Sequence, residues 1–384
     1  MAYVIKSDKI YQNHSLQAGA LTVDGSKITA LSADKAGTAA EEINLSGYRV
    51  LPGLIDTHMH GGNGFDTMDC EEKSINGMSE YLAGVGVTTF YPTTVTSSLE
   101  RTLKAVTVVA DCKEKGVRGA KIGGIYLEGP YISAKFKGAH PEEYIVEINL
   151  DDLAQMIKAA RGNVKTVAIA PEKAGATEAV KFLKNQGVTT TLGHSDATYD
   201  ETLAAIKAGA RAGIHIYNAM RPLHHREPGI LGATLVTDGF AAEMICDGIH
   251  VNPRSMEIVT RCKHTDDVIL ITDCMCAGGM PDGKYMLGEL PVVVQNGIAR
   301  TEKGALAGST LKLINGVKNA VQLVGVPFED AIRFATENPA RQLGIINEVG
   351  TLEEGKTADI IAIDDDYNVV FVMIDGKIVK PLVK

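Results

Sequence analysis

Eight short apolar segments recur along the middle of the chain, and they alternate with segments that have the periodicity of helices. Short runs that are almost entirely apolar are typical of strands buried on both faces of a parallel sheet. Parallel strands need crossover connections, and a helix between two strands supplies one. The predicted strands are residues 50–56, 87–91, 122–127, 166–170, 188–192, 212–216, 241–246 and 268–272.

Several of the intervening segments have recognisable helix boundaries. Thr198 and Glu201 fit a capping box at the start of a helix, and Gly209 ends that helix. Residues 98–115 and 151–160 are also periodic, and a glycine follows shortly after each. Eight strands alternating with helices over roughly 220 residues predict an α/β fold, a (β/α)8 TIM-like barrel. An open doubly wound sheet is the alternative, and the lack of a Gly-x-Gly-x-x-Gly loop after the first strand disfavours it.

Both ends of the chain read as short strands joined by turns. Asp24-Gly25 and Asp375-Gly376 each lie between two short apolar runs, which is a hairpin signature. Two β-rich ends around a different middle predict one small β-sandwich domain formed by the N- and C-terminal segments. We expect the small domain to comprise residues 1–51 and 345–384, and the barrel to comprise residues 52–344.

The charge balance limits the partners. The chain has 38 Lys and Arg residues against 47 Asp and Glu residues, a net charge of -9. We therefore expect neither nucleic acid nor an anionic membrane as a partner, and an anionic substrate would need a local cluster of cationic and N–H groups. The N-terminus lacks a signal pattern, no long apolar stretch is present, and six cysteines are too sparse for a disulfide framework. These features predict a cytoplasmic protein with reduced thiols.

Residue types that bind metals occur at the carboxyl ends of the predicted strands, where barrel enzymes build their active sites. A single buried histidine is more often a hydrogen-bonded core residue than a metal ligand. Four imidazoles and two carboxylates at one rim, however, would be costly to bury without a cation to coordinate. The sequence therefore predicts a divalent metal site. The six residues are His58, His60, Glu128, His194, His215 and Asp273.

Motifs along the chain resemble the amidohydrolase superfamily of metal-dependent barrels. Residues 52–61, Pro-Gly-Leu-Ile-Asp-Thr-His-Met-His-Gly, carry the first part of this resemblance, and the later strand ends carry the rest. More specific strings resemble a branch of the superfamily that deacetylates phosphorylated amino sugars, in the expected order through the barrel and both flanking pieces. These strings are residues 126–131, 137–140, 192–195, 217–220, 226–229, 247–250 and 306–309.

The resemblance implies a set of metal ligands. Glu128, His194 and His215 would hold the metal that activates water, and His58 and His60 would help to bind a second metal bridged by Glu128. We therefore expect one or two divalent ions per subunit. Zinc is the first choice, and iron, manganese and cobalt stay open because His and carboxylate ligands suit all of them.

The resemblance also implies hydrolysis of the acetamide of N-acetyl-D-glucosamine 6-phosphate to D-glucosamine 6-phosphate and acetate. Such a site must supply hydroxide, polarise the carbonyl and protonate a basic leaving amine. Asp273 at the eighth strand end lies near the first strand once the barrel closes. It suits a general base that accepts the proton of water and returns it to the amine nitrogen.

Contacts to this sugar phosphate are implied in the same way. Arg226 suits phosphate because its planar donors pair with two oxygens. In the family this arginine can reach the site of a neighbouring subunit, which implies a homodimer. The implied contacts are Ala139, His140, Asn218, Ala219, Arg226, His250, Leu306, Ala307 and Gly308.

Two alternatives stay open at this point. The substrate could be the galactosamine epimer, which differs in the configuration of one hydroxyl group, and no motif in the sequence identifies a residue that would contact this group. The chain could also be a non-catalytic barrel that binds sugar phosphates, since a fold alone does not establish activity. The presence of all five predicted ligands and of Asp273 disfavours the second alternative.

Overall fold

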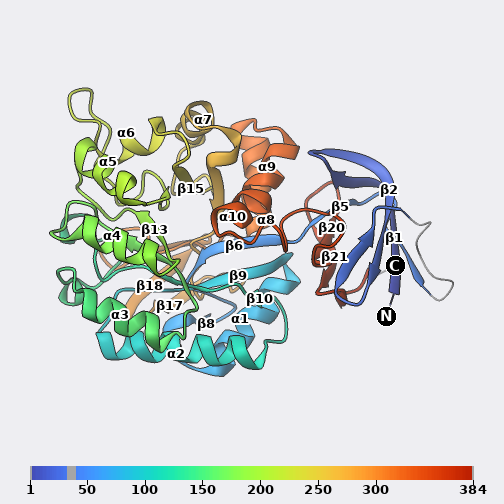
Figure 1. Cartoon of the computed structure of the whole chain (residues 1–384), viewed down its shortest axis with the longest axis horizontal. Helices are drawn as coiled ribbons and strands as arrows, with labels where there is room; N and C mark the ends of the chain where they lie inside the picture. The colour runs from blue at the N-terminus through green and yellow to red at the C-terminus, as the bar shows by residue number, and fades with distance from the viewer. Residues whose placement is uncertain (1, 33–39, 383–384) are drawn as a thin grey trace.

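The computed structural model describes residues 2–32 and 40–382. Figure 1 shows a large body of strands surrounded by helices and, beside it, a smaller β body that contains both ends of the chain. The larger body carries the candidate site, and its strands determine where the functional side chains lie.

Parallel strands form the barrel, and each hydrogen-bonds to the next around the ring. The ring closes because Asp273 N, just after the last strand, donates to His58 O of the first strand at 2.9 Å. The prediction of a (β/α)8 barrel is therefore confirmed, and the open sheet is excluded. The strands are β6 (Leu54–Met59), β9 (Val87–Thr94), β10 (Lys121–Ile122) with β11 (Ile125–Leu127), β12 (Val164–Ile169), β13 (Thr189–Leu192), β14 (Ala212–Gly213), β15 (Ala241–Ile245) and β16 (Val268–Ile271).

The first predicted strand, residues 50–56, is divided in the structure. Its first half is β5 (Arg49–Pro52), which pairs in the small sheet, and its second half is β6 in the barrel. Gly53 separates them at a point where a β-carbon would lie 2.2 Å from Thr88 Oγ1. Only glycine allows the chain to pass so close to the neighbouring strand while it crosses from one sheet to the other.

Helices surround the barrel. The predicted capping box is present: Thr198 N donates to Glu201 Oε2 at 2.8 Å, and Gly209 follows the last residue of α5. The helices are α1 (Glu72–Gly84), α2 (Leu99–Lys115), α3 (Leu150–Ala159), α4 (Ala176–Asn185), α5 (Tyr199–Ala208), α6 (Gly229–Val236), α7 (Pro253–Cys262), α8 (Leu313–Asn319), α9 (Phe328–Ala335) and α10 (Glu337–Gln342). None of the helices within the described ranges is long and apolar enough to cross a membrane.

Short helical turns complete the connections. Three of them, η1, η2 and η3, lie in loops at the carboxyl ends of barrel strands. The turns are η1 (Thr67–Asp69), η2 (Ala134–Phe136), η3 (Glu142–Tyr144), η4 (Thr265–Asp267) and the π-helical η5 (Ala320–Val324).

Strands from both ends of the chain share the small sheet. β5 pairs antiparallel with β20 and parallel with β1, so the sheet joins the two terminal segments. The domain boundaries at 1–51 and 345–384 stay a prediction, and residues 1, 33–39 and 383–384 of these ranges lie outside the described residues. The strands are β1 (Ala2–Gln12), β2 (Ser15–Asp24), β3 (Lys27–Ala30), β4 (Glu41–Asn44), β5, β20 (Ile360–Ile363), β21 (Val369–Ile374) and β22 (Lys377–Lys380).

Two hairpin turns of this sheet touch each other. Asp375-Gly376 joins β21 to β22 with positive φ at both residues, as a type I′ turn requires. A β-carbon on Gly376 would lie 1.9 Å from the carbonyl oxygen of Gly25, in the turn between β2 and β3.

We therefore expect Gly376→Ala to lower the free energy of unfolding by about 2–4 kcal/mol, because it adds a backbone clash to an unfavourable φ. Urea unfolding measures the effect. Gly25→Ala is the matched control, because Gly25 also has positive φ, but a β-carbon there meets nothing within 4 Å. Its expected cost is about 1 kcal/mol. Equal costs for the two variants would contradict the predicted clash.

A three-stranded antiparallel sheet between β16 and α8 was not predicted. It comprises β17 (Gly283–Leu287), β18 (Leu290–Gln295) and β19 (Ile298–Thr301). Val292 and Val294 alternate with exposed residues, and they pack with Leu287 and Val95 in one hydrophobic cluster. A smaller hairpin of β7 (Gly61–Gly62) and β8 (Phe65–Asp66) follows β6. The inserted sheet brings Leu287 to the mouth of the barrel.

Candidate active site and metal centre

The barrel strands bring the six predicted metal-ligand residues to one place. His58 lies in β6, and His60 follows that strand, so their ring Nε2 atoms face each other at 3.4 Å. Glu128, His194, His215 and Asp273 follow β11, β13, β14 and β16. His194, His215 and Asp273 have φ values of 45°, 29° and 50°. This left-handed backbone is costly for residues other than glycine and is concentrated at functional sites.

One candidate metal group contains Glu128, His194 and His215. Glu128 Oε1 lies 3.2 Å from His194 Nε2 and 3.1 Å from His215 Nε2, and the two ring nitrogens are 2.9 Å apart. Ligands at about 2.0–2.2 Å from a tetrahedral ion would lie about 3.3–3.6 Å from one another. The observed spacing and the donor types therefore fit a divalent ion with little adjustment.

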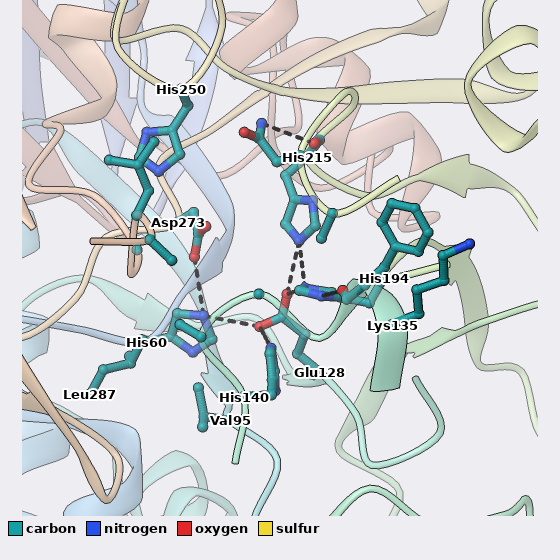
Figure 2. A pocket seen from close by; sticks show the side chains of 18 residues that line it. His60, Val95, Glu128, Lys135, His140, His194, His215, His250, Asp273 and Leu287 are labelled. Atoms are coloured by element: carbon teal, nitrogen blue, oxygen red, sulfur yellow. Dashed lines mark hydrogen bonds and ion pairs between the residues drawn. The ribbon is translucent and has the colours of Figure 1, made fainter. Parts of the chain in front are cut away.

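A second candidate group adjoins the first through the other oxygen of Glu128. His60 Nε2 lies 3.1 Å from Glu128 Oε2 and 3.1 Å from Asp273 Oδ1, and His58 Nε2 lies 3.5 Å from the same Asp273 oxygen. Figure 2 shows Glu128 between His60 on one side and His194 and His215 on the other. In each group the residue types and the short distances between their ligand atoms are those of a metal site, and the Glu128 carboxylate contacts both groups.

The buried imidazoles keep both carboxylates ionised. Burial raises the pKa of Asp273, but hydrogen bonding by His60 and the charges of His58 and His60 outweigh it and lower the pKa to about 2. Burial also raises the pKa of Glu128, but His58 and His140 outweigh this effect and hold the pKa well below its usual range. Ionised carboxylates are the form that binds cations.

Hydrogen bonds at Nδ1 distinguish the histidines that could bind metal from one that could not. His194 Nδ1 donates to Phe136 O at 2.9 Å and His60 Nδ1 to Thr93 O at 3.3 Å, so the neutral form of each ring has its lone pair on Nε2, where a metal ion would displace any proton. His140 has the opposite arrangement, because Thr96 N donates to His140 Nδ1 at 3.2 Å. Burial lowers the pKa of His140 to about 4, so its neutral ring carries the proton on Nε2. His140 is therefore a hydrogen-bond donor beside the two groups.

A cavity of about 350 Å³ opens above the metal-ligand groups. It is lined by most of the predicted substrate contacts, together with five of the six metal-ligand residues; His58 lies behind them and is fully buried. The predicted substrate contacts that line it are Ala139, His140, Asn218, Ala219, His250, Leu306 and Gly308.

Two predicted contacts lie outside the cavity lining. Arg226 is exposed, and its guanidinium contacts His225 Nε2 at 2.8 Å. Ala307 is fully buried in the hydrophobic cluster beneath the inserted sheet. Neither side chain lines the cavity.

His250 is positioned by an acid. Its Nδ1 lies 2.6 Å from Asp247 Oδ2, and the other Asp247 oxygen accepts hydrogen bonds from the backbone N–H groups of Ile249 and His250. Burial raises the pKa of Asp247, but His250 and these N–H groups outweigh it and lower the pKa. Nε2 of His250 stays available to a ligand in the cavity.

The sequence reasoning missed further residues that line the cavity. Val95 directly follows β9, so its position at a strand end was a usable signal. Lys135 and Phe136 lie in the loop that also holds His194 through the Phe136 carbonyl. Ala305 and Leu287 come from the inserted segment, which was not predicted. The missed residues are mostly apolar, and apolar residues carry no distinctive chemical motif.

The chain is similar to known proteins over most of its length. The sequence model of the Amidohydrolase family matches residues 49–379. The N-acetylglucosamine-6-phosphate deacetylase of Vibrio furnissii is 42% identical over 380 residues, which cover 98% of this chain and 95% of the relative. The N-acetylgalactosamine-6-phosphate deacetylase of Escherichia coli O157:H7 is 42% identical over 329 residues, covering 86% and 87%.

A solved structure is similar over almost the whole chain. It is a mutant N-acetyl-D-glucosamine-6-phosphate deacetylase from Mycobacterium smegmatis in complex with N-acetyl-D-glucosamine-6-phosphate. Its TM-score to this chain is 0.93 with 35% sequence identity, and the match covers 99% of both chains.

Proposed function

The chain belongs to the amidohydrolase family, and we propose from this premise that it hydrolyses N-acetyl-D-glucosamine 6-phosphate to D-glucosamine 6-phosphate and acetate. The observation that carries the proposal is the pair of candidate metal-ligand groups that meet at Glu128 on the floor of the cavity. The similarity to an N-acetylglucosamine-6-phosphate deacetylase, which covers 98% of this chain, identifies the substrate class. Relatives named for the glucosamine substrate match almost the whole chain, and the similar solved structure is a complex with N-acetyl-D-glucosamine-6-phosphate, which favours the glucosamine substrate.

Glu128, His194 and His215 would hold one divalent ion, and His58, His60 and Asp273 a second. A bound ion supplies Lewis acidity to the acetamide carbonyl and lowers the pKa of water toward neutrality. We propose zinc as the native ion, because buried imidazole and carboxylate ligands in sets of three suit it. Iron, manganese and cobalt are the other ions that these ligands accept.

Asp273 is the proposed proton carrier. Its ionised carboxylate lies at the floor of the cavity, within 3.1 Å of His60 Nε2. It would accept a proton from the attacking water as the C–O bond forms. It would then return that proton to the amine nitrogen as the C–N bond breaks, so that acetate and a protonated amino sugar are released.

The remaining polar groups would orient the substrate. His140 offers an Nε2–H beside the metal groups, and His250 offers Nε2 from its Asp247-anchored ring. Asn218 and the Ala219 N–H would contact the sugar phosphate, with Ala139, Leu306 and Gly308 around the sugar.

We propose a homodimer in which Arg226 of one subunit reaches the phosphate in the other. The support is that Arg226 is exposed on a loop beside the exposed apolar side chain of Leu223, and that a phosphate needs a cation. We also propose a cytoplasmic location, because phosphorylated sugars do not cross membranes unaided and the cysteines are free thiols. Sedimentation analysis tests the dimer.

The proposed substrate is tested by kcat/KM for the two epimeric N-acetylamino-sugar 6-phosphates. We expect acetate release from both, with the glucosamine epimer preferred by about 10-fold or more. Metal analysis of the same preparation is expected to give one to two divalent ions per subunit. A preference for the galactosamine epimer would reassign the substrate, and substrate binding without acetate release under any divalent ion would indicate a non-catalytic barrel.

A further inference from the structure

Two aliphatic side chains lie among the buried, mostly polar residues that line the cavity. They are Val95 and Leu287, each only 3% exposed, whereas Leu306 is partly buried and Ala305 and Lys135 are exposed. The two deep aliphatic side chains have no place in the reaction described above. The substrate has one aliphatic group at its reacting end, the methyl group of the acetyl.

Val95 is held between two histidines of the site. Two residues before it, Thr93 O accepts a hydrogen bond from His60 Nδ1 at 3.3 Å, and one residue after it, Thr96 bonds His140 Nδ1 through both its N and its Oγ1. These bonds fix the backbone on both sides of Val95. Figure 2 shows Val95 beside His60 and His140.

Leu287 approaches Val95 from the inserted sheet. It is the last residue of β17, and the two-residue turn Gly288-Glu289 joins it to Leu290 of β18. A β-carbon on Gly288 would lie 3.3 Å from Val95 Cγ1, so the tip of the hairpin rests on Val95. Val95 and Leu287 belong to one buried cluster.

Three polar contacts fix this hairpin tip to the barrel. Gly288 N donates to the buried Asp66 Oδ2 at 3.2 Å, while Glu289 accepts from Ser97 Oγ and Arg101 Nη1 at 3.0 Å each. Leu287 therefore cannot withdraw without breaking bonds to the β8 loop and to α2. A wall held in this way sets a fixed limit to the space beside it.

We propose that Val95 and Leu287 form the acyl pocket of the enzyme and limit the acyl group that it removes to two carbons. The inference rests on the proposed deacetylase function. The acetyl methyl would pack against the two side chains, with the carbonyl facing the metal groups and the sugar extending toward Asn218 and His250. A longer acyl chain would collide with the fixed hairpin tip, and a formyl group would leave the pocket empty.

The test compares kcat/KM for glucosamine 6-phosphates that carry N-formyl, N-acetyl and N-propionyl groups. Wild-type enzyme should prefer acetyl to propionyl by about 10-fold or more. Leu287→Ala should raise the propionyl-to-acetyl ratio by about 10-fold, because it removes the wall that meets the extra carbon. Leu290→Ala is the matched control: Leu290 faces Leu287 across the same hairpin, does not line the cavity, and should leave the ratio within about twofold.

Val95→Leu tests the pocket from the opposite direction. The added carbon should lower kcat/KM for the acetyl substrate by about 10-fold or more and leave the formyl substrate within about twofold. This variant decides the question if Leu287→Ala fails to fold. Unchanged ratios in folded, acetate-releasing variants overturn the acyl pocket and leave the deacetylase function intact. No acetate release by the wild-type enzyme overturns the function and this inference with it.

Discussion

Asp273→Asn is expected to lower kcat by about 10²-fold or more, because the amide cannot accept the proton of water. The change is nearly isosteric, and the two backbone bonds at this position, Asp273 N to His58 O and Ser309 N to Asp273 O, do not involve the side chain. The barrel should therefore close as before. Glu128, His194 and His215 are untouched, so at least one divalent ion should stay bound.

Steady-state turnover and metal analysis of the same sample measure this result. Asp200→Asn, at an exposed position in the first turn of α5, is the matched control and should retain wild-type turnover. Wild-type turnover in Asp273→Asn would remove Asp273 from its role as proton carrier. Loss of all bound metal in that variant would instead indicate that Asp273 acts chiefly as a metal ligand.

Glu128→Gln is expected to have the largest effect, a loss of about 10³-fold or more in kcat together with loss of bound metal. Glu128 gives one oxygen to His194 and His215 and the other to His60, so it belongs to both candidate metal sites. An amide keeps one oxygen acceptor and replaces the other oxygen with an NH₂ group that cannot bind a cation. Both sites therefore lose a charged ligand.

The metal content of Glu128→Gln is expected to fall below one ion per subunit. Chelator-treated wild-type enzyme should show the same loss of turnover, and added divalent ion should restore only the wild-type protein. Glu178→Gln on the exposed face of α4 is the matched control, with unchanged metal content and turnover expected. Full activity in metal-free Glu128→Gln would contradict the metal-dependent mechanism.

The barrel was predictable because burial on both faces leaves a strong pattern. Each of the eight apolar runs overlaps a barrel strand, and the capping box at Thr198 and Glu201 forms as expected. The division of the first run at Gly53 was missed, because both halves are equally apolar and only the partner strands distinguish them. The inserted sheet was missed because its strands alternate buried and exposed residues over short lengths.

The site was predictable where strand ends carry chemical residue types, as at Glu128 and His194. The backbone conformation of the site was not predictable, because the closed barrel, rather than residue preference, imposes the positive φ at His194, His215 and Asp273. The location of Arg226 outside the cavity also depends on tertiary structure, since a loop residue has no pattern that fixes its direction. The position of Leu287 in the cavity lining could not be predicted from the sequence, because its hairpin approaches the site only after folding.

The pairing of β5 with β20 affects the order in which this protein is assembled. The ribosome makes β20 roughly 300 residues after β5, so the first terminal strands wait for their partners while the whole barrel is synthesised. During that interval the outer edge of β5 presents free N–H and C=O groups, a template on which a second nascent chain can add a strand. Chaperone protection of the nascent N-terminal strands, and aggregation when translation stalls before β20, are the consequences expected of this long-range pairing.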